Sequence, residues 1–297
     1  RGASFRHRDD QPDLLQAATF EDLVEDAHAA MRTLHGHPRA LASPLVVLGH
    51  SEGAAIATRV ALRAPEIDLV VLLGSMARST RSLLEYQLVD RNLHFLRRAA
   101  DADGDGVLTL EEMNGLDGNF GLSSVYVYNS AEILFDVTPS ELGRASVDSF
   151  NSTVDVNGDG QLQIDDEIEP RMRREANRFL ALATDGSLGR HWQSSIQTEA
   201  LVSFIHQVDV PILFVHGELD AQTPLDEALT LMAKLEAAGR DSYELLVFPA
   251  AGHSLSKPND TYSGDGGLSL LDNLTLNAPP PGVRRRLLQR IEAILAQ

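Results

Sequence analysis

The stretch "PLVVLGHSEGAAIATRVALRAP", residues 44–65, carries the strongest indication of fold. Its first part, "PLVVLG" (44–49), is a short apolar run with β-branched residues, which predicts a strand buried on both faces, as in a parallel sheet. Its last part, "EGAAIATRVALRAP" (52–65), predicts a helix that ends before a proline. Between them, Gly49-His50-Ser51-Glu52-Gly53 has a small residue two positions either side of a serine. Glycines there let the backbone pass closely, so the segment predicts a serine on a sharp strand-to-helix turn.

The same alternation of strand and helix continues on either side of this segment. Further buried strands are predicted at 68–74, 210–217 and 243–249, and helices at 19–34, 225–238 and 283–296. Thr19 and Asp22 have the spacing of a capping box at the first helix. Strands and helices that alternate, with continuous apolar strands, predict an α/β fold with a parallel sheet.

Residues 78–206 break the alternation, because they contain no buried-strand run and read as helical and acidic. Helical segments at 82–99, 140–154 and 167–182 flank two acidic loops. We therefore expect three parts: 1–77 and 207–297 as the two halves of a core, and 78–206 as an inserted cap.

Composition excludes several classes of protein. The net charge is −18, which makes nucleic acid and anionic membranes poor partners, and no apolar run is long enough to span a membrane. The absence of cysteine excludes disulfides, thiol catalysis and thiolate metal sites. Five acidic residues fall in 101–112 and four in 155–166, a concentration that indicates a divalent cation.

The serine at the predicted turn has suitable partners in suitable places. A hydroxyl needs a base to become a nucleophile, and the base needs an acid to orient it. Asp220 follows the strand at 210–215 in "HGELDAQTP" (216–224), and His253 follows the last strand in "PAAGHSL" (249–255). Catalytic groups collect at the carboxyl ends of parallel strands. Glu218 could replace Asp220, and His191 with Trp192 could line a substrate cleft.

These motifs, "GHSEG", "HGELDAQTP" and "AAGHS", resemble the α/β-hydrolase family, particularly its serine-aminopeptidase-like and esterase-like members. The resemblance covers roughly 1–77 and 207–297. It implies Ser51 as nucleophile, His253 as general base and then acid, Asp220 as the orienting acid, and the Glu52 N–H as an oxyanion donor.

The start of the chain departs from that family. "RGASFRH" (1–7) resembles the segment that follows the family's fourth strand. This implies that the first four strands and the second oxyanion donor lie in a missing N-terminal segment. We then expect a sheet of about four strands with 44–48 at its edge, unless a partner strand pairs there. An open edge predicts self-association, and a lost oxyanion donor predicts low activity of these residues alone.

Two loops have the ligand spacing of an EF-hand, which supplies six to eight oxygens to Ca²⁺. In "DADGDGVLTLEE" (101–112) the expected ligands are Asp101, Asp103, Asp105, the Val107 carbonyl, Thr109 and Glu112. In "DVNGDGQLQIDD" (155–166) they are Asp155, Asn157, Asp159, the Gln161 carbonyl, Gln163 and Asp166. Asp166 is one methylene shorter than glutamate, which weakens calcium binding or favours a smaller ion. Because weak EF-hand sites suit compartments rich in calcium, they favour an extracytoplasmic setting.

The sequence therefore predicts a serine hydrolase that acts on a small-molecule carboxylic ester, with two bound Ca²⁺ ions that order the cap. A calcium-dependent binding module, dockerin-like or sensor-like, on a hydrolase scaffold is the alternative from another class. A peptidase or lipase of the same fold is a third. The loops start at 101 and 155, 54 residues apart, which is wider than a compact dockerin or a usual EF-hand pair.

Overall fold

The structure is a computed structural model of the 297-residue chain, and it describes residues 17–38, 40, 43–115, 134, 148–255 and 281–297. These residues fall into two compact units. The first unit holds the described residues up to Leu83, from Ala181 to 255, and from 281 onward; the second holds those from Leu84 to Leu180. Residues 181–206 thus belong with the core, although the expected cap extended to residue 206.

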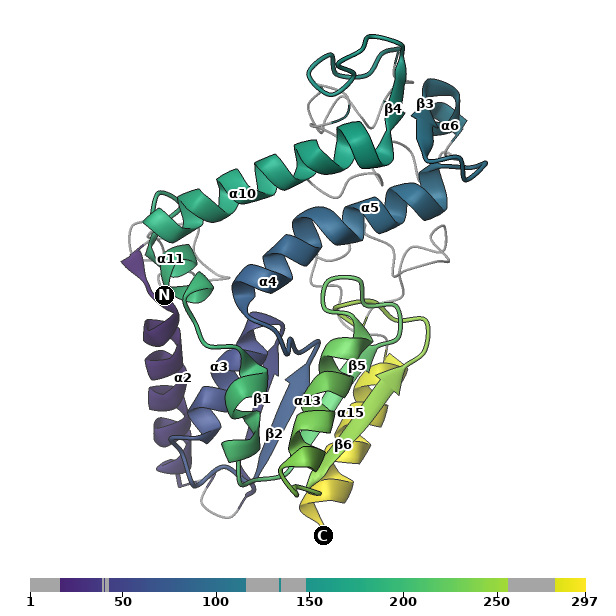
Figure 1. Cartoon of the computed structure of the whole chain (residues 1–297). Coiled ribbons are helices and arrows are strands. Elements are labelled where there is room, and N and C mark those ends of the chain that lie inside the picture. The colour runs from purple at the N-terminus through teal and green to yellow at the C-terminus, as the bar shows by residue number, and fades with distance from the viewer. Residues whose placement is uncertain (1–16, 39, 41–42, 116–133, 135–147, 256–280) are drawn as a thin grey trace. The chain divides into compact units, whose positions relative to one another are not determined.

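One parallel sheet forms the centre of the first unit, with strand order β1-β2-β5-β6 (Figure 1). The strands are β1 (Val46–His50), β2 (Leu69–Leu73), β5 (Ile212–Gly217) and β6 (Tyr243–Phe248). In register, Val46 lies beside Leu69, Val70 beside Ile212, and Ile212 beside Tyr243. The prediction of an α/β fold with a parallel sheet of about four strands is confirmed, and all four carboxyl ends lie at one edge of the sheet.

Strand β1 lies at the edge of the described sheet, as expected for residues 44–48, although its apolar composition alone predicts burial on both faces. Within the described residues it pairs with β2 alone, and its burial alternates along the strand. Val47 and Gly49 are buried, whereas Leu48 is 50% exposed. By contrast, every residue of β2 is buried, because β2 has a neighbour on each side. An edge strand has fewer neighbours to cover its side chains, which explains the difference.

The helices of this unit are α2 (Phe20–His35), α3 (Glu52–Ala61), α11 (Arg190–Ile196), α12 (Leu201–Phe204), the 3-10 turn η4 (Ile205–Gln207), α13 (Leu225–Ala237) and α15 (Pro281–Leu295). Of these, α3, α13 and α15 pack on the sheet, and α11 packs on α2. The apolar side of α15, including Leu287 and Ile291, packs on a core of strand residues that includes Val71 and Val215. At the start of α2, Thr19 Oγ1 accepts from Asp22 N at 3.1 Å and the Asp22 carboxylate accepts from Thr19 N at 2.8 Å, which confirms the capping box.

The second unit is helical around a small two-stranded sheet. Its elements are α4 (Thr80–Glu85, which begins in the first unit), η1 (Tyr86–Asp90), α5 (Arg91–Phe95), η2 (Leu96–Ala100), β3 (Val107–Thr109), α6 (Leu110–Gly115), β4 (Gln161–Gln163), η3 (Ile164–Ile168) and α10 (Glu169–Asp185, which ends in the first unit). Strands β3 and β4 pair antiparallel, and their middle residues Leu108 and Leu162 are fully buried in the core of the unit.

The segment between the two loops differs from its prediction where it is described. Residues 148–154, which precede the second loop, are not helical, because a turn occupies 152–154. The rest of the helix expected at 140–154 lies outside the described residues. Among the helices that are described, none is both long and apolar enough to cross a membrane.

Candidate active site and paired acidic loops

Ser51 lies on the turn between β1 and α3, at the carboxyl edge of the sheet. Its backbone has φ 56° and ψ −123°, and its N–H donates to Leu73 O at 2.9 Å. A Cβ at Gly49 would lie 2.0 Å from the Gly53 carbonyl oxygen, so only glycine fits at position 49. A Cβ at Gly53 would have no atom within 4 Å. The expected close passage of the backbone therefore requires Gly49 but not Gly53.

The structure brings the other two predicted catalytic residues into contact. Asp220 follows β5 and His253 follows β6, and His253 Nδ1 lies 2.8 Å from Asp220 Oδ2. Asp220 is 4% exposed. Glu218, the alternative acid, is exposed and instead accepts from Ala250 N at 3.2 Å. The contact with His253 thus belongs to Asp220.

His253 also lies beside the residue that precedes the candidate nucleophile. The rings of His50 and His253 are 4.6 Å apart between centroids, and His50 Nε2 lies 3.0 Å from His253 O. Burial lowers the pKa of His50, and the nearby His253 ring lowers it further. A neutral His50 therefore adds no positive charge next to the predicted base.

Two residues that the sequence did not single out hold Asp220 in place. Thr223 N donates to Asp220 Oδ1 at 3.0 Å, and Thr223 Oγ1 lies 2.9 Å from Oδ2 and 3.0 Å from Gly74 O at the end of β2. His216 is fully buried, with Nε2 2.6 Å from Thr223 O and 3.5 Å from Asp220 Oδ2. Both residues lie within the motif "HGELDAQTP", but nothing in its spacing shows that their side chains turn toward the acid.

These contacts keep Asp220 ionised. Burial alone would raise the pKa of Asp220, but the charge and hydrogen bond of His253, then His216 and the Thr223 N–H, hold that pKa below its ordinary value. Because its Oδ2 contacts Nδ1 of the His253 ring, the buried Asp220 carboxylate fixes the orientation of His253 and stabilises its protonated form.

The residue after Ser51 is tied to a distant helix. Glu52 begins α3, so its N–H is free of an intrahelical partner and is placed as the predicted oxyanion donor. Its side chain accepts a hydrogen bond from Ser195 Oγ, and its other oxygen lies 3.1 Å from His191 Nε2. His191 and Trp192, expected to line a cleft, lie in the first turn of α11, and their ring centroids are 6.2 Å apart.

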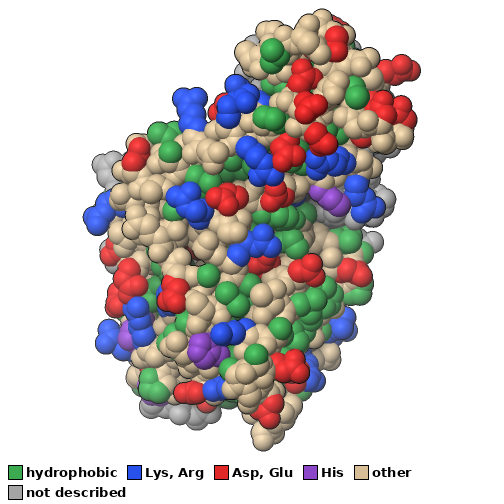
Figure 2. All heavy atoms as spheres, viewed as in Figure 1, with side chains coloured by type: hydrophobic (Ala, Val, Ile, Leu, Met, Phe, Trp, Pro, Cys, Tyr) green, Lys and Arg blue, Asp and Glu red, His purple; other side chains and the backbone are tan. Residues whose placement is uncertain are grey.

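The first acidic loop folds around its own carboxylates. Ligand oxygens of Asp101, Asp103 and Asp105 lie within 4.8 Å of one another. Asp101 is 7% exposed and accepts from the N–H groups of Gly104, Asp105 and Gly106 at 2.8, 3.1 and 3.0 Å. Figure 2 shows acidic side chains gathered at the β3–β4 end of the second unit. An all-oxygen set of this kind suits a hard cation such as Ca²⁺.

Glu112 closes the first loop. Its Oε1 accepts from Ala102 N and its Oε2 from Thr109 N, both at 2.9 Å. Burial alone would raise the pKa of Glu112, but the Thr109 and Ala102 hydrogen bonds outweigh it and lower that pKa. Glu112 is therefore held as a carboxylate at the ligand position predicted for it.

The second loop repeats the first. Asp155 accepts from Gly158, Asp159 and Gly160 N–H groups at 2.8, 3.2 and 3.0 Å, as Asp101 does one loop earlier. The turn glycines Gly106 and Gly160 have φ of +83° and +75°. The loops are joined by the β3–β4 ladder, despite the 54 residues between their starts. They form a pair, which their spacing argued against.

The residue that closes the second loop differs from the prediction. In the first loop Thr109 N donates to Glu112, three residues on; in the second, Gln163 N donates to Glu167 Oε2 at 2.9 Å, four residues on. The extra residue is taken up by η3 (Ile164–Ile168), a π-helical turn with wider i→i+5 bonding. Glu167 is half-buried, whereas Asp166 is exposed. Glu167, and not Asp166, is thus the structural equivalent of Glu112.

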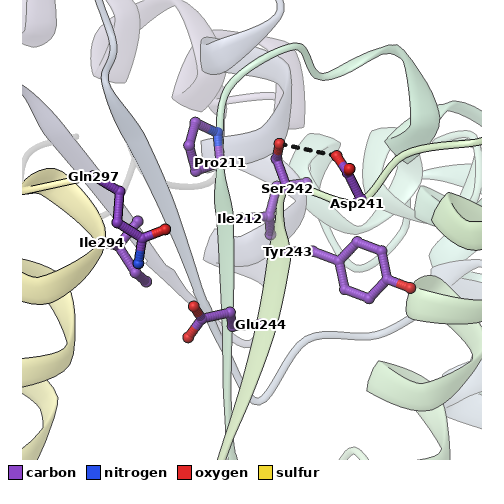
Figure 3. A pocket seen from close by; sticks show the side chains of 8 residues that line it. All are labelled: Pro211, Ile212, Asp241, Ser242, Tyr243, Glu244, Ile294 and Gln297. Carbon is purple, nitrogen blue, oxygen red and sulfur yellow. Dashed lines mark hydrogen bonds between the residues drawn. The ribbon is translucent and has the colours of Figure 1, made fainter.

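A cavity of about 440 Å³ lies at the opposite end of the sheet from Ser51 (Figure 3). It is lined by Pro211 and Ile212 at the start of β5, 241–244 at the start of β6, and Ile294 and Gln297. None of the candidate catalytic residues borders it. Because parallel sheets place their chemistry at the carboxyl ends of the strands, we assign this cavity no role in catalysis.

In comparisons with known proteins, two peptidase family models match separate parts of the chain, and both support the α/β-hydrolase family that the sequence motifs resemble. The family model described as serine aminopeptidase, S33, matches residues 9–101, which include Ser51. The model described as the prolyl oligopeptidase family matches residues 182–264, which include Asp220 and His253. The two matches fall on the two segments that build the parallel sheet, and they support this family for the chain. No curated protein matches the chain.

Solved structures are similar at low identity. A peroxisomal α/β-hydrolase from Saccharomyces cerevisiae is 13% identical, with 95% of this chain and 62% of that chain covered and a TM-score of 0.44. A carboxylesterase structure from Nitrososphaera gargenis is 11% identical, with 95% and 74% covered and a TM-score of 0.42. A thermophilic esterase from Thermogutta terrifontis is 15% identical, with 80% and 66% covered and a TM-score of 0.37.

Proposed function

We propose that this protein hydrolyses carboxylic esters through an acyl-enzyme on Ser51, with His253 and Asp220 as base and orienting acid. The observation that carries the proposal is the 2.8 Å contact between His253 Nδ1 and Asp220 Oδ2, at the sheet edge where Ser51 stands on a strained turn. A Ser, a His and an Asp from three separate strand ends meet the requirement of a nucleophile, its base and an orienter.

Each step follows from these groups. With Nδ1 held by Asp220, His253 Nε2 is the nitrogen that takes the Ser51 proton as Oγ attacks the ester carbonyl. The carbonyl oxygen becomes an oxyanion that the Glu52 N–H stabilises. His253 then gives its proton to the leaving alcohol, which leaves the acyl group on Ser51. Water, deprotonated by His253, attacks the acyl carbon and releases the acid and free Ser51.

We further propose that Ca²⁺ binds both loops of the second unit and orders that unit. Asp101, Asp103, Asp105 and Glu112 in the first loop, and Asp155, Asp159 and Glu167 in the second, are the supporting carboxylates. Clustered carboxylates repel one another without a cation, so a cation that neutralises them stabilises the folded unit. Because β3 and β4 join the two loops, an ion in one loop favours the ordered form of the other.

Peptide hydrolysis is the second candidate, since the two matching family models are described as serine aminopeptidase and prolyl oligopeptidase. Amides and esters pass through the same acyl-enzyme, so the triad geometry does not separate them. Turnover of an aminoacyl p-nitroanilide, compared with the matching p-nitrophenyl ester, distinguishes the two substrates.

The proposal is tested with Ser51→Ala, using short p-nitrophenyl esters and a fluorophosphonate probe of active serines. We expect Ser51→Ala to lose both the label and nearly all turnover, on the order of 10⁶-fold for a serine triad. Ser43→Ala is the matched control, because Ser43 is exposed just before β1 and should keep both. Esterase activity or labelling that survives in Ser51→Ala would show that Ser51 is not the nucleophile.

A further inference from the structure

Glu52 is the acidic residue that directly follows the candidate nucleophile. Glu52 directly follows Ser51, and its carboxylate is 35% exposed. Its own N–H is the donor proposed to receive the oxyanion. A carboxylate on the residue that donates to the oxyanion opposes the negative charge that forms on the substrate oxygen, unless another group neutralises it.

His191 is the group that faces this carboxylate. Its Nε2 lies 3.1 Å from Glu52 Oε2, and its side chain is 29% exposed. Ser195, one turn further along α11 and fully buried, donates to the other oxygen of Glu52. Both carboxylate oxygens are therefore bound by side chains of one helix, and Ser195 is 143 residues from Glu52 in the sequence.

Helix α11 is itself anchored, so it holds Glu52 firmly. Ser194 Oγ accepts from Phe20 N, at the start of α2, at 2.7 Å and donates to His191 O at 2.9 Å. Just beyond the helix, Arg59 Nη2 of α3 donates to Glu199 O at 2.9 Å. These bonds join α11 to α2 and α3, and a rotation of Glu52 would have to break its contacts with this fixed helix.

We infer that His191 is a positioning residue for the reaction at Ser51: as an imidazolium it neutralises the Glu52 carboxylate and fixes it away from the forming oxyanion. This inference rests on the proposed function. It makes protonated His191 a requirement for full activity, in addition to the base His253.

The charges around the pair are consistent with this role. The hydrogen bond that His191 donates to the Glu52 carboxylate raises the pKa of His191 above its ordinary value, although partial burial opposes this shift. Burial would raise the pKa of Glu52, but the bonds from His191 and Ser195 lower it. Glu52 is the charged group that acts on His191, while His50, on the turn itself, responds to His253 and Asp220 instead. His191 is thus protonated and paired with the Glu52 carboxylate below its raised pKa. As pH rises through that pKa, His191 becomes neutral and Glu52 keeps its negative charge.

The test is the pH profile of kcat/KM, which reports ionisations of the free enzyme. The proteins compared are wild type, His191→Gln, Glu52→Gln and the double variant, with an ester substrate. We expect a fall in kcat/KM on the alkaline side for wild type, as His191 loses its proton. His191→Gln should lower kcat/KM about tenfold and remove that fall. The interaction energy of two unit charges about 10 Å apart, at an effective dielectric constant of about 20, changes a rate constant by roughly this factor.

The double variant separates charge from structure. With the carboxylate also removed, its kcat/KM should rise above that of His191→Gln, because no charge remains to be neutralised. His35→Gln, at the exposed end of α2, is the control and should keep the wild-type profile. A His191→Gln variant with the wild-type profile, or a double variant no better than His191→Gln, would overturn the inference. An inactive wild type that no serine probe labels would instead contradict the proposed function.

Discussion

Replacing Glu167 by glutamine should weaken Ca²⁺ binding at the second loop by about 30-fold, whereas Asp166→Asn should change it by less than about threefold. The structure gives the reason: Glu167 accepts from Gln163 N as Glu112 accepts from Thr109 N, while Asp166 is exposed. A unit charge 4 Å from another contributes about 1 kcal/mol in water, hence about 2 kcal/mol for a divalent ion, which is about 30-fold in affinity. A carboxylate outside the ligand shell is screened by solvent and salt.

The assay is calorimetric titration with CaCl₂ in a Glu112→Gln background, which weakens the first site and leaves the second to be measured. Glu111→Gln serves as the matched background, since Glu111 is the exposed neighbour of Glu112. If Asp166→Asn weakens binding as much as Glu167→Gln, the loop closes on Asp166 and the structural equivalence is wrong. If no variant and no wild type binds Ca²⁺, the calcium proposal fails as a whole.

Two further predictions concern the core. Gly49→Ala should lower the free energy of unfolding in urea by about 1–3 kcal/mol, the range for forced overpacking, because its Cβ would lie 2.0 Å from Gly53 O. Gly53→Ala should be tolerated, because its Cβ would have no atom within 4 Å. Equal effects of the two variants would contradict the geometry of the turn. Asp220 has a pKa held below its ordinary value of 3.8, so its ionised form contributes stability that is complete above that value and is lost as pH falls through the lower folded-state pKa. The difference in unfolding free energy between wild type and Asp220→Asn should therefore shrink as pH falls below about 3.8, and a difference that stays constant there would show that the pKa of Asp220 is not lowered by folding.

The sequence by itself determined the class of fold and the positions of the candidate site residues along the chain. The apolar run "DLVVLLG" (68–74) predicts a strand covered on both sides, and the turn between strand and helix at Ser51 has a local pattern of small residues. The clustering of the Asp101, Asp103 and Asp105 carboxylates was equally readable, because these residues alternate along one short loop. Local rules of this kind work since the determining contacts are made within a few residues of each other.

Contacts between distant segments were decided only by the tertiary structure. Strand β1 reads as a buried strand, yet Leu48 is half exposed, because burial depends on how many neighbours a strand has and not on its own composition. The bonds of Glu52 to His191 and Ser195 join residues about 140 positions apart, and no periodicity signals them. Glu167 replaced Asp166 because a π-helical turn moved the register by one residue. Such a turn is set by the packing of Ile164 and Ile168 in the core of the second unit, which a motif of fixed spacing does not contain.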